Sequence, residues 1–359
     1  EMSKYMNELE NAGLELINRV KQEKKDVATI VKADVARMDF YPTSIQNTSD
    51  AIKHYVRSWA SGIGRKKLFP GFHPGVYLEN FPKIKNTQDP LAHYLQAAEP
   101  DGPWKYEIIS EINKFPQAAI KEDVALHIHV YYPELLPEIL KCLDQNRIHP
   151  DLFFSVPNTA VNINVSEMTG DYHGQVKKIV TVPNRGRDIG PFLTEFGSAL
   201  SQNYEIIGHV HTKKTSGFNE EIIVKWRNFL LENLIGGTYK MADNIINQML
   251  NDTSIGLVFP DNPDIIGWDK NLSFARPLAE KLGIEQLPKH FNFPVGTMFW
   301  GRVKALQPLF ELDLKYEDYP TEPLPYDGSM LHALERLLPF VVKNMGYKNV
   351  LTNVKGITR

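Results

Sequence analysis

The chain has 359 residues, of which 42% are hydrophobic, and its formal net charge at pH 7 is -3. This length accommodates one large domain and a smaller attachment, because domains usually hold about 100–200 residues. The near balance of 40 Lys and Arg against 43 Asp and Glu indicates no nucleic-acid partner, since proteins that bind nucleic acids carry a basic excess.

Two further features indicate the cellular compartment. The single cysteine, Cys142, cannot build a disulfide framework and is expected to be a small buried hydrophobe. No run approaches the about 20 apolar residues that span a bilayer, and no signal peptide opens the chain. We therefore expect a cytoplasmic protein, with peripheral attachment to the inner face of the cell membrane as the alternative.

Residues 1–62 form the first segment. Apolar residues recur along it at helical spacing, which predicts amphipathic helices. Ser49 and Asp50 are residue types that cap helix starts, and Gly62 ends the helical pattern that follows them. We expect this N-terminal helical segment to pack on the rest of the protein; a partner subunit and a membrane surface are the alternatives.

Residues 63–120 differ in composition. This stretch is dense in proline, glycine and aromatic residues and shows no clear period, which is typical of a compact irregular connector module. Its many aromatic residues offer apolar area to bury, and this argues against disorder.

Residues 121–359 alternate between strand-like and helix-like patterns. Strands are predicted at residues 125–132, 151–157, 177–184, 204–212, 254–260 and 293–301, and helices at 133–146, 189–201, 222–236, 241–250 and 331–345. Strands separated by helices imply βαβ crossovers, so we predict an α/β fold of the Rossmann type, with a mostly parallel sheet and helices on both faces. Ligands of such sheets bind at the carboxyl ends of the strands.

The first polar set at a strand end is Asn184, Arg185, Gly186, Arg187 and Asp188, directly before a predicted helix. Arginine forks suit phosphate oxygens, and a helix N-terminus adds backbone donors and partial positive charge. The pattern therefore favours a diphosphate site. A salt-bridged helix start, with Asp188 as the N-cap and both arginines in solvent, explains the same residues equally well.

A second polar set follows the fourth predicted strand. His209 and His211 share one face of this strand, and Lys213 and Lys214 come where it ends. Such a group suits a polyanion or a metal, since fixed cations or a divalent ion can stabilise a diphosphate leaving group. We favour fixed cations, because neither histidine has a carboxylate nearby in the sequence to complete a metal-ligand set.

A glycine interrupts the apolar strand predicted at residues 293–301. At Gly296 and the adjoining Thr297 the backbone can approach a ligand closely. A glycine required by core packing is the competing explanation.

Carboxylates crowd the loop before the last predicted helix, among them Glu322 and Asp327. Asp327 nearly adjoins that helix, so it is either an N-cap or a general base held near an acceptor hydroxyl. Glu335 and Arg336, inside the helix, are expected to form an exposed or packing pair. The chain contains no nucleophile elbow, Walker loop, dinucleotide fingerprint or zinc-ligand spacing.

Seven stretches stand in one order along the chain: HIHVYYPELLPEIL, DLFFSVPN, VPNRGRDIGPFL, IGHVHTKK, GLVFP, FPVGTMFWGRVKAL and DGSMLHALERLLP. This order resembles the rhamnan synthesis protein F family of bacterial glycosyltransferases over residues 122–345. The resemblance implies an enzyme that makes rhamnose-containing surface polysaccharide, with dTDP-L-rhamnose as the sugar-nucleotide donor. It also implies a lipid-linked or oligosaccharide acceptor, and partners among other domains or subunits of a polysaccharide-assembly complex.

The order of motifs is also similar to that of inverting GT-A transferases, which implies a GT-A-like fold for the α/β part. By this similarity Tyr131 and Tyr132 stand at the nucleotide-binding turn after the first strand, and Asn184 begins an Asn-x-Gly donor element. Asp327 best matches the position of the catalytic base, and Glu322 is the second choice.

One element departs from the GT-A pattern. His209, Val210 and His211 stand where the metal-binding Asp-x-Asp motif would fall. The departure favours transfer without a metal or other cofactor, in which Lys213 and Lys214 replace the divalent ion. A divalent metal is the alternative.

Two other functions compete with an inverting glycosyltransferase. A non-catalytic glycan- or nucleotide-binding scaffold module accounts for the missing Asp-x-Asp motif and for the N-terminal helices. A sugar-phosphate transferase would use the same cationic site.

Overall fold

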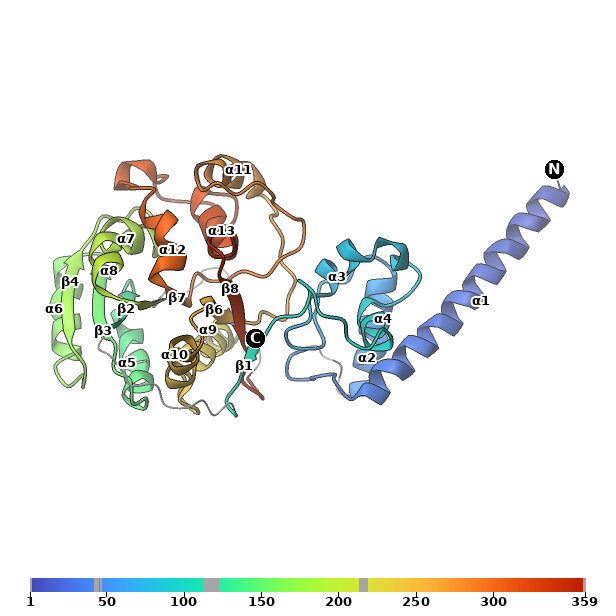
Figure 1. Cartoon of the computed structure of the whole chain (residues 1–359), viewed down its shortest axis with the longest axis horizontal. Coiled ribbons are helices and arrows are strands. Elements are labelled where there is room, and N and C mark those ends of the chain that lie inside the picture. The colour runs from blue at the N-terminus through green and yellow to red at the C-terminus, as the bar shows by residue number, and fades with distance from the viewer. Residues whose placement is uncertain (1, 42–44, 46, 113–122, 213–218, 358–359) are drawn as a thin grey trace. The chain divides into compact units, whose positions relative to one another are not determined.

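The computed structural model describes residues 2–41, 45, 47–112, 123–212 and 219–357 (Figure 1). The chain forms two compact units, Glu1–Tyr106 with Pro263–Ile266, and Glu107–Asn262 with Gly267–Ile357. Within the described ranges, no helix combines the length and the apolar character that a membrane span requires.

The smaller unit is helical. It contains α1 (Met2–Ala33), α2 (Thr48–Ala60), α3 (Pro74–Asn80), the 3-10 turn η1 (Pro82–Ile84) and α4 (Pro90–Gln96). The N-cap of α2 is Asn47, whose side chain accepts the Asp50 N–H at 2.8 Å, rather than Ser49 or Asp50. The predicted helical segment and most of the predicted connector thus share one compact unit, whose first segment ends at Tyr106.

Aromatic residues of the connector build much of the core of this unit. The buried ring of Tyr77 has Phe81 at 4.5 Å, Trp104 at 5.2 Å and Phe72 at 5.5 Å, measured between ring centroids. Tilted and edge-to-face ring pairs stabilise a core beyond the apolar area that they bury. The connector therefore contributes to an ordered core although its sequence shows no helical or strand period.

The larger unit is built on one eight-stranded sheet. Its strands are β1 (Ile108–Ile109), β2 (Val124–His129), β3 (Asp151–Val156), β4 (Val176–Thr181), β5 (Ile206–His211), β6 (Ile255–Pro260), β7 (Phe299–Arg302) and β8 (Lys348–Thr352). Their order across the sheet is β1-β8-β6-β7-β5-β2-β3-β4, and all neighbours are parallel except β7, which runs antiparallel to β5 and β6. The predicted α/β fold with a mostly parallel sheet is confirmed. β1 and β8 add two strands that the sequence patterns do not predict.

Helices cover both faces of this sheet (Figure 1). They are α5 (Leu136–Asp144), α6 (Thr159–Met168), α7 (Ile189–Thr194), α8 (Gly197–Asn203), α9 (Glu220–Leu234), α10 (Met241–Asn251), α11 (Leu272–Lys281), α12 (Val303–Phe310) and α13 (Met330–Asn344). On one face, Leu126 and Val210 join an apolar core with residues of α5, α9 and α10. The other face carries His127 and His209, over which α7 packs through Phe192.

The single helix predicted at residues 189–201 is two short helices, α7 and α8. The break occurs because the N–H groups of Glu195 and Phe196 both turn back to the Pro191 carbonyl, at 3.0 and 3.2 Å. It leaves the Phe196 ring 4.9 Å from that of His127, so the connection between the helices also covers the sheet.

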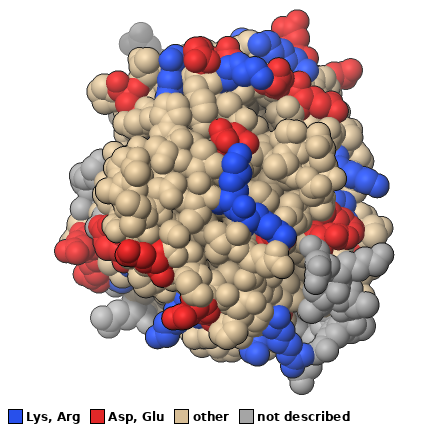
Figure 2. Space-filling view, turned by 90° about the vertical axis from the view of Figure 1, so that its left-hand side faces the viewer, with Lys and Arg blue, Asp and Glu red and all other residues tan. Residues whose placement is uncertain are grey.

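β4 forms one edge of the sheet and carries two lysines. Lys177 lies 3.2 Å from Asp151, and Lys178 lies 3.0 Å from Glu195. Charged side chains on an edge strand discourage pairing with another chain. Figure 2, which looks onto this side of the molecule, shows basic and acidic groups interspersed among uncharged surface.

Candidate active site

Several chain segments meet at the edge of the sheet where the parallel strands end. β2 and β5 are neighbours in parallel register, and the residues after them touch, since the Tyr132 N–H donates to the Thr212 hydroxyl at 3.0 Å. Because β7 is antiparallel, its first residues lie at the same edge, beside the end of β5. This is the edge at which parallel sheets bind their ligands.

The loop after β4 depends on a glycine. Gly186 has a φ of 85° and Arg187 a φ of 50°, both in the left-handed region. A Cβ atom at Gly186 would lie 2.8 Å from the Gly190 Cα, a backbone clash that only a shift of the chain relieves. The Gly186 carbonyl accepts the Gly190 N–H at 2.7 Å at the start of α7. The left-handed conformations of these two residues thus turn the chain sharply and set the position of the Arg187 side chain.

Arg185 holds a neighbouring loop. Its guanidinium donates to the backbone carbonyls of Tyr319 at 2.6 Å and Glu317 at 2.8 Å. Both bonds fasten the segment before α13 against the loop after β4, so Arg185 positions this segment instead of extending into solvent. Asn184, the residue before it, is exposed.

Arg187 lies among groups from the segment that leads into α13. Its guanidinium is 3.3 Å from Glu322 Oε1, 3.3 Å from His332 Nε2 and 3.3 Å from the Pro325 carbonyl. These distances are longer than those of strong charge-assisted hydrogen bonds, which are about 2.7–2.9 Å. Glu322 also accepts the Leu324 N–H at 2.7 Å. The structure therefore brings Arg187 and Glu322 together in a loosely bonded group.

Asp327 lies on the turn before α13. Its Oδ1 accepts a hydrogen bond from the Asn271 side chain at 2.7 Å and is 3.5 Å from Arg336 Nη2. Burial raises the pKa of Asp327. The Asn271 hydrogen bond and the nearby Arg336 and His332 lower it by more, so the net pKa shift is downward. The N-cap of α13 is Ser329, which makes the N-cap interpretation of Asp327 wrong.

A ladder of four histidines lies on the face of the sheet that α7 covers. In the register of β2 and β5, His127 is opposite His209 and His129 is opposite His211. His127 Nδ1 is 2.9 Å from His209 Nδ1, and the Ser155 hydroxyl contacts His127 and His129 at 2.9 and 2.8 Å. Burial lowers the pKa of His127 well below its ordinary value, so this imidazole is neutral.

The sequence patterns single out only half of this ladder. His209 is fully buried, and its Nε2 is 3.5 Å from Asp188 Oδ2. Asp188 stands at the N-cap position of α7 but makes no side-chain capping bond within the described part of the chain, and it faces the ladder instead. His127 and His129 alternate along β2 as His209 and His211 do along β5, and this repeated alternation is the signal that locates them.

The predicted strand around Gly296 begins only at Phe299. Gly296 and Thr297 have φ values of 91° and 57°, which belong to a turn and not to a strand. Their N–H groups both donate to Glu335 Oε1, at 2.6 and 3.0 Å, and the Gly296 carbonyl is 2.7 Å from His211 Nε2. These two amides therefore bind Glu335, a buried residue of α13.

The remaining predicted site residues follow β2 and β5. Lys213 and Lys214 lie outside the described residues. Tyr131 is exposed, and its ring centroid is 5.0 Å from that of Tyr132, just before the 3-10 turn η2 (Pro133–Leu135). β2 ends at His129. The two tyrosines thus follow this strand, whereas the strand pattern predicts them as its last two residues.

The family model described as rhamnan synthesis protein F matches residues 86–347, which is more than half of the chain. The chain belongs to the rhamnan synthesis protein F family. The family predicted from the motif order is confirmed, and every candidate residue described above lies within the matched range.

Two curated relatives of this family member come from Xanthomonas campestris pv. campestris, strains B100 and ATCC 33913, and both are called "Uncharacterized protein WxcX". Each is 27% identical over 238 residues, a match that covers 65% of this chain and 33% of the relative. The chain thus spans about a third of the length of these relatives.

Two solved structures show a distant likeness. A cytidylyltransferase from Leptospira borgpetersenii has 10% identity and a TM-score of 0.32 over 65% of this chain and 76% of its own. Core-mannan synthase A from Aspergillus fumigatus has 12% identity and a TM-score of 0.33 over 73% of this chain and 84% of its own. TM-scores this low add nothing to the α/β topology that the sheet itself establishes.

In this rhamnan synthesis protein F family member, His332 contacts Arg187 and lies close enough to Asp327 to lower the pKa of that carboxyl. Its Nδ1 is 2.8 Å from the Ser329 hydroxyl, and its Nε2 faces Arg187. The arginine fork suits an anionic ligand such as a phosphate, whereas Glu322 and Asp327 can accept a proton or a hydroxyl hydrogen bond. The arrangement can therefore combine anion binding with general-base chemistry.

Proposed function

We propose that this chain is a glycosyltransferase that moves a sugar from a nucleotide donor onto a growing surface polysaccharide, with L-rhamnose from dTDP-L-rhamnose as the sugar. Membership of the rhamnan synthesis protein F family supports this role. The observation that carries the proposal is that Arg187 contacts His332 while Asp327 lies within electrostatic reach of the same histidine. A cation for phosphate and a candidate base thereby border one position at the ligand-binding edge of the sheet.

The donor is held through its diphosphate and its nucleotide. Arg187 exchanges its 3.3 Å contacts for shorter charge-assisted bonds to phosphate oxygens. Lys213 and Lys214 add positive charge as the nucleoside diphosphate leaves, which replaces a metal ion in this role. Tyr131 and Tyr132 contact the nucleotide.

Other predicted donor-site residues shape the site in this proposal. Arg185 has its guanidinium engaged by backbone carbonyls, and Gly296 and Thr297 have their amides engaged by Glu335. These groups position the loops around the donor without binding it. Asn184 is exposed, so its side chain remains available to contact the donor, as predicted from the sequence.

The reaction is a single displacement that inverts the sugar. An acceptor hydroxyl gives its proton to Asp327 and attacks the anomeric carbon; the new glycosidic C–O bond forms as the bond to the diphosphate oxygen breaks. Asp327 can accept this proton because its carboxyl, whose pKa is lowered, is ionised at neutral pH. Glu322 is the second candidate, since this carboxylate lies 3.3 Å from Arg187 and becomes available as a proton acceptor when Arg187 exchanges that contact for the donor phosphates.

Donor hydrolysis and sugar-transfer assays test the proposal. A panel of nucleotide sugars is offered with and without chelator, and water replaces the acceptor in the hydrolysis arm. We expect turnover of dTDP-L-rhamnose that survives the chelator and releases sugar of inverted configuration. Turnover of another donor alone overturns the choice of sugar, and loss of turnover with chelator overturns the metal-independent mechanism. Binding of sugar nucleotides without turnover of any would favour the scaffold module.

A further inference from the structure

Two histidines and a carboxylate cluster at the amino ends of the strands, whereas the candidate active site lies at the carboxyl ends. Asp144 ends α5, His149 precedes β3, and His173 precedes β4. One ligand atom from each of these residues lies within 4.8 Å of the other two. His173 Nδ1 is 3.2 Å from Asp144 Oδ1, and the two imidazole ring centroids are 5.5 Å apart. We propose that Asp144, His149 and His173 form a binding site for Zn²⁺.

The ligand types fit zinc. Imidazole nitrogen and carboxylate oxygen are its common protein ligands, and three protein ligands with a water in the fourth position make a tetrahedral site. Mg²⁺ and Ca²⁺ prefer all-oxygen sites and are disfavoured by two imidazoles. Ligand atoms around tetrahedral zinc are about 3.3 Å apart, so the cluster must contract. The side chains of His173 and Asp144, which are 69% and 34% exposed, have room to rotate inward.

His149 is the more constrained ligand. Its Nε2 is buried and has no hydrogen-bond partner among the described residues. A buried ring nitrogen without a partner is unfavourable, and such a group calls for an ion or a water that satisfies it. The His149 ring also packs edge-on against Tyr172, with 6.0 Å between ring centroids, which limits how far it can turn.

The backbone that carries the ligands is held by hydrogen bonds of its own. The Asp243 carboxylate accepts two consecutive backbone N–H groups just before His149, at 2.9 and 3.0 Å. The Tyr172 hydroxyl donates to the Pro150 carbonyl at 2.8 Å, which ties the segment that carries His173 to the start of β3. Ligands on a backbone fixed in this way lose little freedom when a metal binds.

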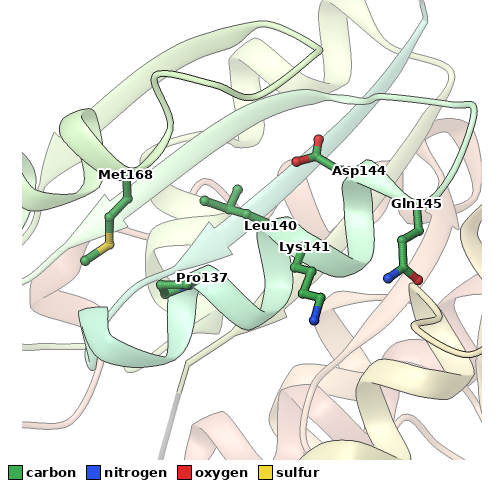
Figure 3. A pocket seen from close by; sticks show the side chains of 6 residues that line it. All are labelled: Pro137, Leu140, Lys141, Asp144, Gln145 and Met168. Carbon is green, nitrogen blue, oxygen red and sulfur yellow. The ribbon is translucent and has the colours of Figure 1, made fainter.

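Asp144 also borders an open hollow of about 470 Å³. The hollow is lined by Pro137, Leu140, Lys141, Asp144, Gln145 and Met168. Figure 3 shows the Asp144 carboxylate turned away from the Lys141 ammonium and from Gln145. The negative charge of this carboxylate is therefore directed away from the cation of its own helix.

A bound ion would join three separate elements of the larger unit, namely the end of α5 and the starts of β3 and β4. Since the site lies at the amino ends of the strands, this inference is independent of the proposed glycosyl transfer. The full chain is tested without a polyhistidine tag, because such a tag binds the same metals. We expect one Zn²⁺ per chain by calorimetry and a higher unfolding temperature with Zn²⁺, since the ion binds the native state. Co²⁺ in place of Zn²⁺ should give the visible absorption of a four- or five-coordinate site.

The variants His173→Ala and Asp144→Asn change partly exposed side chains, so both should keep the wild-type circular dichroism spectrum. Each should weaken Zn²⁺ binding by at least about 10-fold, the loss that removal of even an outer-shell partner causes. His54→Ala removes an exposed histidine of the smaller unit and should leave the titration unchanged. A wild-type chain that gains no stability from Zn²⁺, or equal Zn²⁺ affinity in the wild type and both ligand variants, overturns the proposal.

Discussion

Glu335 accepts the backbone N–H of Gly296 at 2.6 Å and thereby holds the turn before β7. The same carboxylate oxygen accepts the Thr297 N–H at 3.0 Å, and His211 Nε2 is 2.7 Å from the Gly296 carbonyl. Hydrogen bonds to a charged acceptor are roughly twice as strong as neutral ones. Glu335 thus connects α13 with the end of β5 and the start of β7, which border the candidate site.

Replacing Glu335 with alanine should lower the free energy of unfolding by about 1–3 kcal/mol, because the buried Thr297 N–H loses its acceptor. Glu335→Gln keeps an acceptor oxygen and should cost less. Urea unfolding measures both changes as a shift of the midpoint at constant slope. Glu311→Ala is the control, since this exposed carboxylate accepts from the Gln307 side chain at a helix end and should change stability by no more than about 0.5 kcal/mol. Equal losses in the two alanine variants would show that the turn does not depend on Glu335.

Alternating sequence patterns predict much of the sheet and the edge that carries the site. Because the carboxyl ends of parallel strands coincide, polar residues after separate strands could be expected to meet, and Arg187 and Asp327 do lie near one histidine. The reversed direction of β7 could not be predicted, since an apolar run reads alike in either direction. β1 has two residues and β8 is largely polar, so neither offers a countable period.

Contacts between residues that are far apart in the sequence could not be predicted from sequence patterns. Glu335 stands in an amphipathic helix, where an acidic residue is ordinarily exposed, and its partner Thr297 lies 38 residues earlier in an irregular turn. For His127, the alternation along β2 is visible in the sequence. Only the pairing register of β2 with β5 reveals that this imidazole faces His209.

Arg187→Ala should weaken donor binding by roughly 10- to 100-fold, since a hydrogen bond to a charged group contributes about 1.5–3 kcal/mol. Arg187→Lys should recover part of the affinity, because the ammonium keeps the charge but lacks the planar fork. Arg187 has a φ of 50°, so alanine and lysine bear the same left-handed strain and their difference reports the side chain. Calorimetric titration with dTDP measures the affinities. Arg276→Ala serves as the control, because Arg276 is an exposed residue of α11. Wild-type affinity in Arg187→Ala would show that Arg187 does not bind the diphosphate.

Asp327→Asn should keep donor affinity and lower kcat by at least about 100-fold, the lower end of what general-base catalysis contributes. The asparagine oxygen can still accept the Asn271 hydrogen bond, so the turn before α13 is retained. Asp269→Asn is the matched control, because Asp269 also lies near Arg336, at 3.7 Å, but is more exposed. Transfer kinetics with saturating donor measure kcat. Wild-type turnover in Asp327→Asn would remove the base assignment and turn attention to Glu322.

The pKa of Asp327 also predicts a pH profile. Its net shift is downward from 3.8, so the carboxylate stays ionised from neutral pH to about pH 5, and kcat/KM should not fall in this range through this group. The acid limb should lie below the ordinary value of an aspartate. A kcat/KM limb near neutral pH that disappears in Asp327→Asn would show that the pKa of this carboxyl in the free enzyme is raised, which contradicts the downward shift.

Asp89 makes the smaller unit sensitive to pH. Its Oδ1 accepts the N–H groups of Leu91 and Ala92 at 2.9 Å each and so caps α4. Burial raises the pKa of Asp89 from 3.8 to about 7, and the nearby carboxylate of Asp26 acts in the same direction. The folded state binds the proton of the Asp89 carboxyl more tightly than the unfolded state does. Protonation of Asp89 therefore stabilises the folded state fully below pH 3.8, and this stabilisation is lost as the pH rises through 7.

Asp89→Asn should remove this dependence, because the neutral amide keeps the acceptor oxygen and asparagine caps helices as well as aspartate does. Above about pH 7 the variant should therefore be more stable than the wild type, while the two converge in acid. Urea unfolding at several pH values measures the difference in the free energy of unfolding between wild type and variant. Because the other titrating groups are the same in both chains, the pH dependence of this difference comes from Asp89. Asp50→Asn provides the control: the pKa of this exposed residue is lowered by its hydrogen bonds to Asn47 and Lys53, so its difference should stay flat between about pH 5 and 8. A flat difference for Asp89→Asn over the same range would mean that Asp89 is already ionised in the folded chain at pH 5, and that its burial is offset by its hydrogen bonds to α4.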